Sequence, residues 1–250
     1  MFAAGSELAS FWLLALLVTW ALLLLGSVIA NWRMPDKRQP LATGLRMASS
    51  ASLTLAAWSW YLIARDVPDV ALFALLLAFG MSLGFLGDLS LAELLPLRPF
   101  RQSFLVGMAA FALGHVAYIA AILSLIFART LHMQWVIEYL ALLVGLAGWY
   151  LVVFRGGVGG AALRLVALPY ALLLATTAGF ATALAMQEPL FIPLAIGGAL
   201  FLVSDLLVAG ERFGGLRLPH ISDAIWLTYG PAQMLIVYTV NSALVAVAMR

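Results

Sequence analysis

Residues 70–95, VALFALLLAFGMSLGFLGDLSLAELL, decide the fold class of this chain. No charged residue interrupts them before Asp88, and about 20 apolar residues are enough for an α-helix to cross the hydrocarbon core of a bilayer. A carboxylate at that depth costs roughly 3 kcal/mol on insertion scales, so it usually has a function, a partner or access to water. The stretch therefore predicts a transmembrane helix with a functional acid near one end.

Similar stretches fill the rest of the chain. Of its 250 residues, 65% are hydrophobic and 10% are charged, a balance that excludes a soluble domain. We therefore expect an all-α integral membrane protein with a single transmembrane domain over residues 1–250. The first stretch has no Lys or Arg before Arg33, so we expect it to stay as a helix rather than to be removed as a signal peptide. The eight predicted spans are 11–31, 43–64, 70–95, 100–127, 133–154, 163–186, 190–210 and 224–248.

Basic residues concentrate on one side of this eight-span arrangement. Of the 13 Lys and Arg residues, Arg65, Arg129 and Arg250 fall on the opposite side. By the positive-inside rule, the richer side is cytoplasmic and both termini are outside. We expect a multi-pass protein of the cell membrane, the bacterial inner membrane, and the net charge of +2 gives no reason to expect a nucleic-acid partner. The richer side carries Arg33, Lys37, Arg38, Arg46, Arg98, Arg101, Arg155, Arg164, Arg212 and Arg217.

A second acid, Asp205, occupies nearly the same depth in span 190–210 as Asp88 does in span 70–95. Tyr229 and Gln233 fall in the same inner third of the last span. This gathering predicts a polar pocket that opens toward the cytoplasmic leaflet. The runs after the two acids, DLSLA and DLLVA, also share a pattern that a parallel four-plus-four repeat would explain.

Helical spacing places these acids on stripes of residues that we expect to face inward. Gly80 and Gly84 precede Asp88 at intervals of four, as is typical where another helix packs closely. The other two stripes are Gly107, Phe111, His115 and Tyr118 in span 100–127, and Gly197, Phe201, Asp205 and Val208 in span 190–210.

Purely structural interpretations stay open for each of these residues. Glycine stripes commonly serve packing alone, and a lone intramembrane histidine commonly bonds to a neighbouring helix. Either aspartate could form a buried pair with Arg46 or Arg164. Tyr118 and Tyr229 could be amphipathic anchors.

The remaining residue types restrict the chemistry. There is no cysteine, no H-E-x-x-H zinc motif, no Walker loop and no G-x-G-x-x-G dinucleotide fingerprint. Only His115 of the three histidines lies within a span, so we expect no metal and no cofactor. We expect neither a serine hydrolase nor a zinc hydrolase. What remains is a carboxylate pair, which suits general acid–base hydrolysis through a cationic intermediate.

The chain resembles the YhhN-like lysoplasmalogenase family. The matching runs stand in the family's order over about two-thirds of the chain, and residues 37–40, KRQP, resemble its basic start of the second span. The block at Tyr229 departs from the pattern, because Gly230 stands where a second aromatic residue is expected and Pro231 follows it. The runs are LGDL at 86–89, GMAAFALGHVAYI at 107–119, VSD at 203–205, Arg212-Phe213 and YGPAQ at 229–233.

This resemblance implies a hydrolase that cleaves the vinyl ether bond of lysoplasmalogens, giving a fatty aldehyde and glycerophosphoethanolamine or glycerophosphocholine. Its partners would be a lysophospholipid substrate and the surrounding membrane lipids. Such chemistry needs one protonated acid and one ionised base, as in glycosidases. We expect Asp88 and Asp205 to share these roles. We expect His115, Tyr118, Tyr229 and Gln233 to orient water or glycerol oxygens, and Lys37, Arg38 and Arg46 to bind the phosphate, unless these three serve topology alone.

Two other classes of function compete with the hydrolase. In a proton-coupled transporter or lipid-translocating protein, the two acids would bind protons or cations at alternating faces. In a structural or regulatory membrane protein, neither aspartate would matter much. The acids lie near one leaflet rather than at the bilayer centre, which favours an enzyme reached from that leaflet.

Overall fold

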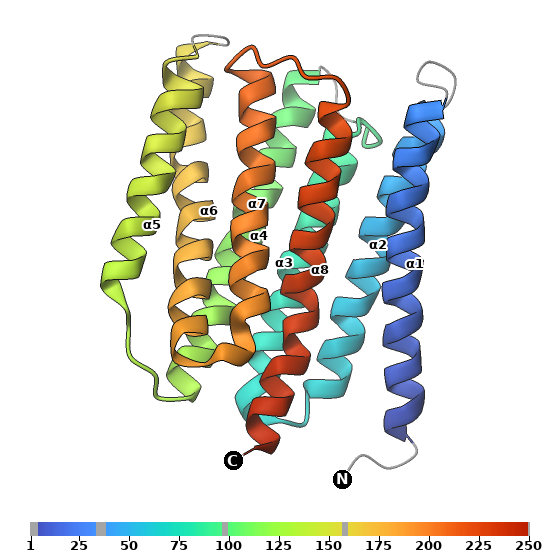
Figure 1. Ribbon diagram of the computed structural model, residues 1–250, viewed down its shortest axis with the longest axis vertical. Coiled ribbons are helices and arrows are strands. Elements are labelled where there is room, and N and C mark those ends of the chain that lie inside the picture. Colours follow the sequence, from blue (N-terminus) through green and yellow to red (C-terminus); the bar gives the residue numbers. More distant parts are fainter. Residues whose placement is uncertain (1–4, 34–38, 97–99, 157–159, 250) are drawn as a thin grey trace.

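The computed structural model describes residues 5–33, 39–96, 100–156 and 160–249. Within these ranges the chain is all-helical, as predicted, and its helices lie side by side along one axis (Figure 1). The α-helices are α1 (Gly5–Arg33), α2 (Gln39–Ala64), α3 (Pro68–Leu91), α4 (Phe100–Ala128), α5 (Trp135–Gly148), α6 (Ala161–Gln187), α7 (Ile192–Arg212) and α8 (Ile221–Ala248). A π-helical segment, η1 (Trp149–Phe154), continues α5, and a short 3-10 helix, η2 (Pro189–Phe191), precedes α7.

Seven of the helices in the described residues are long and apolar enough to cross a membrane, and α2 is not among them. Its sequence explains the difference, because α2 contains four serines and Arg46. Three of these serines, Ser49, Ser50 and Ser52, are buried inside the bundle. The outer faces of the other helices carry many exposed large apolar side chains, such as Phe11 and Leu22, as expected where lipid replaces water. The four-plus-four repeat stays a prediction.

The two ends of the bundle differ in charge. Helix α1 begins and α8 ends at the lower end of Figure 1. At the other end, α1, α3 and α7 end and α2, α4, α6 and α8 begin. We call this second end the basic end. Of the described residues that the sequence placed on the richer side, Arg33, Arg155 and Arg212 lie at this end. Arg65 and Arg129 follow the opposite ends of α2 and α4.

Close packing of α3 against α4 explains the glycine stripes. A Cβ atom at Gly87 would lie 2.6 Å from the Phe111 ring, and one at Gly107 would lie 2.9 Å from Leu91. Gly80, Gly84 and Asp88 are all buried, as are Phe111, His115 and Tyr118, so these two stripes face inward as expected. Small residues let helix backbones approach closely where lipid supplies no hydrophobic driving force.

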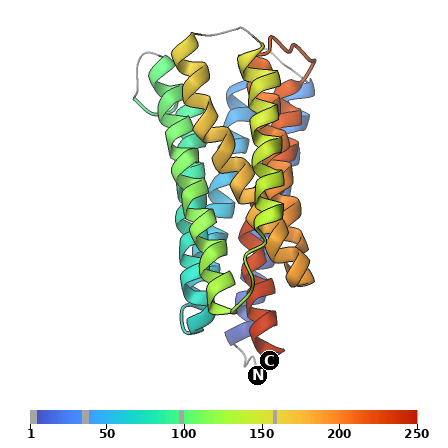
Figure 2. The same ribbon diagram turned by 90° about the vertical axis from the view of Figure 1, so that its left-hand side faces the viewer.

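Helices α5 and α6 complete the side of the bundle where the predicted site residues gather. Helix α6 crosses the bundle at a slant (Figure 2) and contacts α4, α5 and α7. Helix α5 lies at the edge in Figure 1 and packs mainly on α6. A Cβ atom at Gly145 of α5 would lie 2.6 Å from Ala175 of α6, so these two backbones also approach closely. The slant of α6 brings its middle turns against α7.

Candidate active site

Both intramembrane aspartates line one cavity of about 420 Å³ in the half of the bundle nearer the basic end. Its walls are mainly apolar and come from α2 to α8, with η1 supplying Trp149 and Val153. The polar side chains deep in it are Asp88, Tyr170, Asp205 and Tyr229. Helices α3, α4, α7 and α8, which carry the residues of the predicted pocket, all line this cavity, and α2, α5 and α6 line it as well. Ligand pockets of about 300–1,000 Å³ with few polar groups are typical of small-molecule sites.

Asp88 is held by two hydroxyl donors from neighbouring helices. Ser50 of α2 and Tyr229 of α8 both donate to its Oδ2 atom, the tyrosine at 3.0 Å. The carboxyl belongs to a residue that is only 5% exposed. Hydrogen bonds donated to a carboxylate stabilise its charged form, which offsets part of the cost of burial.

A chain of hydrogen bonds runs from Asp88 into the bundle. The Tyr118 hydroxyl donates to Gln233 Oε1 at 2.7 Å, and Gln233 Nε2 donates to the Tyr229 hydroxyl at 3.2 Å. Tyr229 then donates to Asp88, so every donor along the chain points toward the carboxylate. Tyr118, Tyr229 and Gln233 are all buried. Three residues expected to orient groups at the site therefore reach one aspartate through one network.

Asp205 has a simpler environment. The Tyr170 hydroxyl of α6 donates to its Oδ2 atom, and the side chain is less buried than that of Asp88. Apolar residues surround it on the same cavity wall, including Leu202 and Leu206 of its own helix. The two acids thus share a cavity but differ in the number of donors that they accept from.

His115 lies behind the cavity rather than in its wall. Its Nδ1 atom is 3.0 Å from the Thr177 hydroxyl, which itself donates to the Leu173 carbonyl. A hydroxyl has one proton, so Nδ1 carries the hydrogen and Nε2 is left as a buried acceptor without a partner. The ring packs edge-on against Phe201, with centroids 4.5 Å apart. This position supports the aromatic wall behind the acids.

Sequence reasoning missed Ser50, Tyr170 and Thr177, which contact the predicted residues. Nothing in the sequence distinguishes Ser50 and Thr177 from other polar residues of helices. Which residues they contact depends on how each helix is rotated about its axis. Tyr170 gave a clearer signal, since it is a hydroxyl-bearing residue deep in an apolar span and directly after Pro169. A search for every tyrosine inside a span would have found it.

The sequence also contains one serine motif. Residues 80–84, GMSLG, match the G-x-S-x-G pattern of a serine-hydrolase elbow, which requires a sharp strand-to-helix turn. Here the run lies inside the unbroken helix α3. Ser82 donates to the Ala78 carbonyl at 2.8 Å and accepts from Trp58 Nε1 at 3.0 Å. The motif therefore has a helical geometry that does not present a nucleophile.

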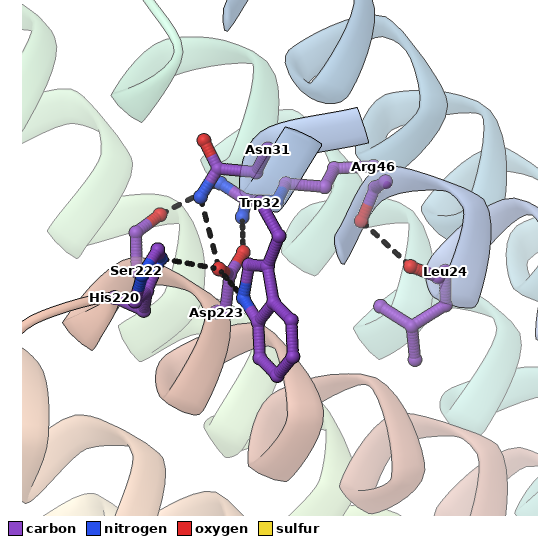
Figure 3. A network of polar contacts seen from close by, with 8 residues as sticks. Leu24, Asn31, Trp32, Arg46, His220, Ser222 and Asp223 are labelled. Atoms are coloured by element: carbon purple, nitrogen blue, oxygen red, sulfur yellow. Dashed lines mark hydrogen bonds and ion pairs between the residues drawn. The ribbon is translucent and has the colours of Figure 1, made fainter. Parts of the chain in front are cut away.

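Arg46, expected to bind phosphate, pairs with Asp223 of α8 and not with Asp88 (Figure 3). It also donates to the Ser222 hydroxyl at 2.6 Å. Asn31 and Trp32 at the end of α1 donate to the same Asp223 carboxylate at 2.9 and 2.8 Å. This cluster ties α1, α2 and α8 together at the basic end, and Arg46 still contributes to the cavity wall.

The other basic candidates are Lys37, Arg38 and Arg164. Lys37 and Arg38 lie outside the described residues. Arg164, the second cation considered as a partner for an aspartate, donates to the Phe154 carbonyl at 3.2 Å. In the part of the chain that the structure describes, no group of three or more His, Cys, Asp or Glu side chains is arranged to hold a metal ion.

Packing explains why Gly230 stands where the family pattern has an aromatic residue. A Cβ atom at Gly230 would lie 2.8 Å from Leu24 of α1. An aromatic side chain there would displace α1 from α8. Pro231 lies inside α8, which continues to Ala248.

Comparison with known proteins identifies the family of this chain. The sequence model of the YhhN family matches residues 41–240, which is most of the chain. The chain therefore belongs to the YhhN family, which includes lysoplasmalogenases. No curated protein and no solved structure matches it.

Proposed function

We propose that this member of the YhhN family is a membrane hydrolase that cleaves the vinyl ether bond of lysoplasmalogens. The products would be a fatty aldehyde and a glycerophospho head group, glycerophosphoethanolamine or glycerophosphocholine. The observation that carries the proposal is the pairing of Asp88 and Asp205 in one apolar cavity large enough for part of a lipid chain. Family membership supports the same reaction class.

The reaction needs a proton donor and a base on the two sides of one bond. The acid gives its proton to the vinyl carbon that is not bonded to the ether oxygen. The positive charge is then shared between the other vinyl carbon and the ether oxygen, as an oxocarbenium ion. The base takes a proton from water as the water oxygen bonds to the cationic carbon. The resulting hemiacetal breaks its bond to the glycerol oxygen, which takes up a proton, and the aldehyde is released.

The environments of the two aspartates suggest how these roles divide. Asp88 accepts from two hydroxyl donors, and such bonds stabilise a carboxylate over a carboxylic acid. We assign to it the base that activates water. Asp205 accepts from one donor in an apolar wall, so fewer hydrogen bonds stabilise its charged form. We assign to it the general acid.

The proposed topology has eight spans, with both termini outside and the cavity nearest the cytoplasmic leaflet. The 26 residues of α2 extend about 39 Å at 1.5 Å per residue, which exceeds the roughly 30 Å of the hydrocarbon core. Its buried serines need not face lipid. Reporter fusions at residues 213–220 should be cytoplasmic, because this connection lies at the basic end. An external reporter there would reverse the orientation.

A substrate panel tests the proposed reaction. Purified protein in detergent or nanodiscs would be given lysolipids that differ only in the chain linkage, which is alkenyl, alkyl or acyl. We expect aldehyde from the alkenyl lipid and no cleavage of the other two. Cleavage of the acyl lipid would contradict the proposal. So would the absence of aldehyde when folded protein is given alkenyl lysolipids with several different head groups.

A further inference from the structure

A second cavity, of about 520 Å³, adjoins the first at the basic end. Its lining is mainly polar and comes from the ends of five helices, α1, α2, α3, α7 and α8. Five of its residues also line the apolar cavity, so the two spaces share part of their walls. The lining residues are Asn31, Ala42, Thr43, Arg46, Leu91, Glu93, Arg212 and Ser222. We call this second space the polar vestibule.

An apolar cavity beside a polar one suits an amphipathic ligand, which has an apolar chain and a polar head group. Along α7, Asp205 lies in the apolar cavity and Arg212 lies seven residues further toward the basic end, about 10 Å at the helical rise. Along α3, Asp88 is in the apolar cavity, Leu91 lines both spaces and Glu93 lines the vestibule. A lipid whose vinyl ether lies at the two acids would thus place its head group in the vestibule.

The charges in the vestibule are of both signs. Arg46 and Arg212 supply guanidinium groups, which suit a phosphate through paired N–H donors. Arg46 pairs with Asp223, and the Arg212 guanidinium lies over the Phe104 ring, 5.8 Å from its centroid. Glu93 adds an exposed carboxylate on the α3 side of the same space. Two cations beside one anion complement a phosphate that carries an ammonium group.

The backbone at Glu93 adopts a left-handed conformation. Glu93 has φ of 56°, in the left-handed region that favours glycine. It follows the end of α3, where its N–H bonds to the Ser90 carbonyl, and glycine is the usual residue at such a helix end. Thr130 and His220 have the same left-handed conformation at other helix ends, so what distinguishes Glu93 is that it lines the vestibule.

We propose that the polar vestibule binds a zwitterionic phospho-amine head group, with Arg212 contacting the phosphate and Glu93 the ammonium. This inference rests on the proposed function, because it names the part of the substrate that the apolar cavity does not hold. Glu93 then determines specificity, selecting ethanolamine or choline lipids over lipids whose phosphate carries no amine.

Binding of uncleavable ligands tests this site separately from catalysis. The ligands would be 1-alkyl-glycerophosphoethanolamine, 1-alkyl-glycerol 3-phosphate and 1-alkyl-glycerol, titrated into protein in nanodiscs. For Glu93→Gln we expect roughly tenfold weaker binding of the first ligand and less than about twofold change for the other two. For Arg212→Gln we expect roughly tenfold weaker binding of both phosphate ligands and unchanged binding of the phosphate-free one.

Matched controls and a second Glu93 variant keep the test decisive. Glu7→Gln at the opposite end and Arg217→Gln in the α7–α8 connection remove the same charges from exposed positions outside both cavities. Neither should alter binding. Glu93→Gly should relieve the left-handed backbone and raise thermal stability, yet it should weaken the amine ligand as Glu93→Gln does. Soluble glycerophosphoethanolamine should compete with the alkyl lipid in the unmodified protein and not in Glu93→Gln.

Equal effects of Glu93→Gln on all three ligands would overturn the proposal, as would an Arg212→Gln effect that does not depend on phosphate. Competition by the soluble head group that is the same with and without Glu93 would also overturn it. Head-group selectivity without aldehyde release would refute only the hydrolase. Aldehyde release without head-group selectivity would refute only the vestibule site.

Discussion

Replacing Tyr229 with phenylalanine removes one hydroxyl from the centre of the proposed site. That hydroxyl donates to Asp88 Oδ2 at 3.0 Å and accepts from Gln233 Nε2 at 3.2 Å. The change leaves Asp88 with Ser50 as its remaining hydroxyl donor and separates it from the Tyr118–Gln233 pair. A hydrogen bond to a charged group contributes about 1.5–3 kcal/mol. We therefore expect kcat for aldehyde release to fall roughly tenfold to a hundredfold.

Tyr238→Phe is the matched control for this variant. Tyr238 lies on the same helix, and its hydroxyl donates to the Leu13 carbonyl at 2.7 Å, away from the cavity. Both variants lose one tyrosine hydroxyl and one hydrogen bond to another helix. The assay would compare kcat, KM and thermal unfolding of the two variants. If Tyr229→Phe kept kcat within twofold of Tyr238→Phe at similar stability, the network would have no role in holding the base.

Two further predictions concern the packing that positions the site. Gly87→Ala should lower thermal stability, because its Cβ would lie 2.6 Å from an aromatic ring of α4. The control Gly44→Ala has nothing within 4 Å of its Cβ and should be neutral or stabilising. Equal unfolding temperatures of the two variants would refute the close α3–α4 contact. Asp223→Asn should destabilise by about 3 kcal/mol, since it leaves the buried Arg46 unpaired, and the double variant Arg46→Met, Asp223→Leu should recover part of that loss. A double variant less stable than the single one would show that the pair itself contributes most of the stability.

The apolar runs of the sequence determine much of what the structure shows. Each span had to be a helix, because a backbone in lipid must satisfy its own hydrogen bonds. Placing Asp88 and Asp205 at one depth needed only helix direction and a count of residues. The inward stripes on α3 and α4 followed from the spacing of glycines. These features depend on a single helix at a time.

Features that depend on two helices were not predictable in the same way. Which helix supplies a donor to each acid depends on helix order and rotation, and nothing in the periodicity of α2 or α6 points Ser50 or Tyr170 at an aspartate. The pairing of Arg46 with Asp223 has the same origin, since the interaction joins α2 to α8. The distance along the sequence gives no hint of this contact. Physical proximity in a bundle is set by packing of whole helix faces.

The most direct measurement of the central claim is aldehyde release by Asp88→Asn, Asp205→Asn and the double variant. Each change keeps the shape of the side chain and removes its acid–base capacity. If the carboxyls act in one reaction, each single variant should lose roughly 10²–10⁴-fold in kcat. The double variant should lose far less than the product of the two, because both groups serve the same transition state.

Asp66→Asn, an exposed aspartate at the opposite end of the bundle, is the control and should keep full activity. Thermal unfolding of every variant would show that the loss is not a failure to fold. Near-normal hydrolysis by a folded Asp88→Asn or Asp205→Asn protein would remove that residue from the mechanism. Near-normal hydrolysis by both would contradict the account.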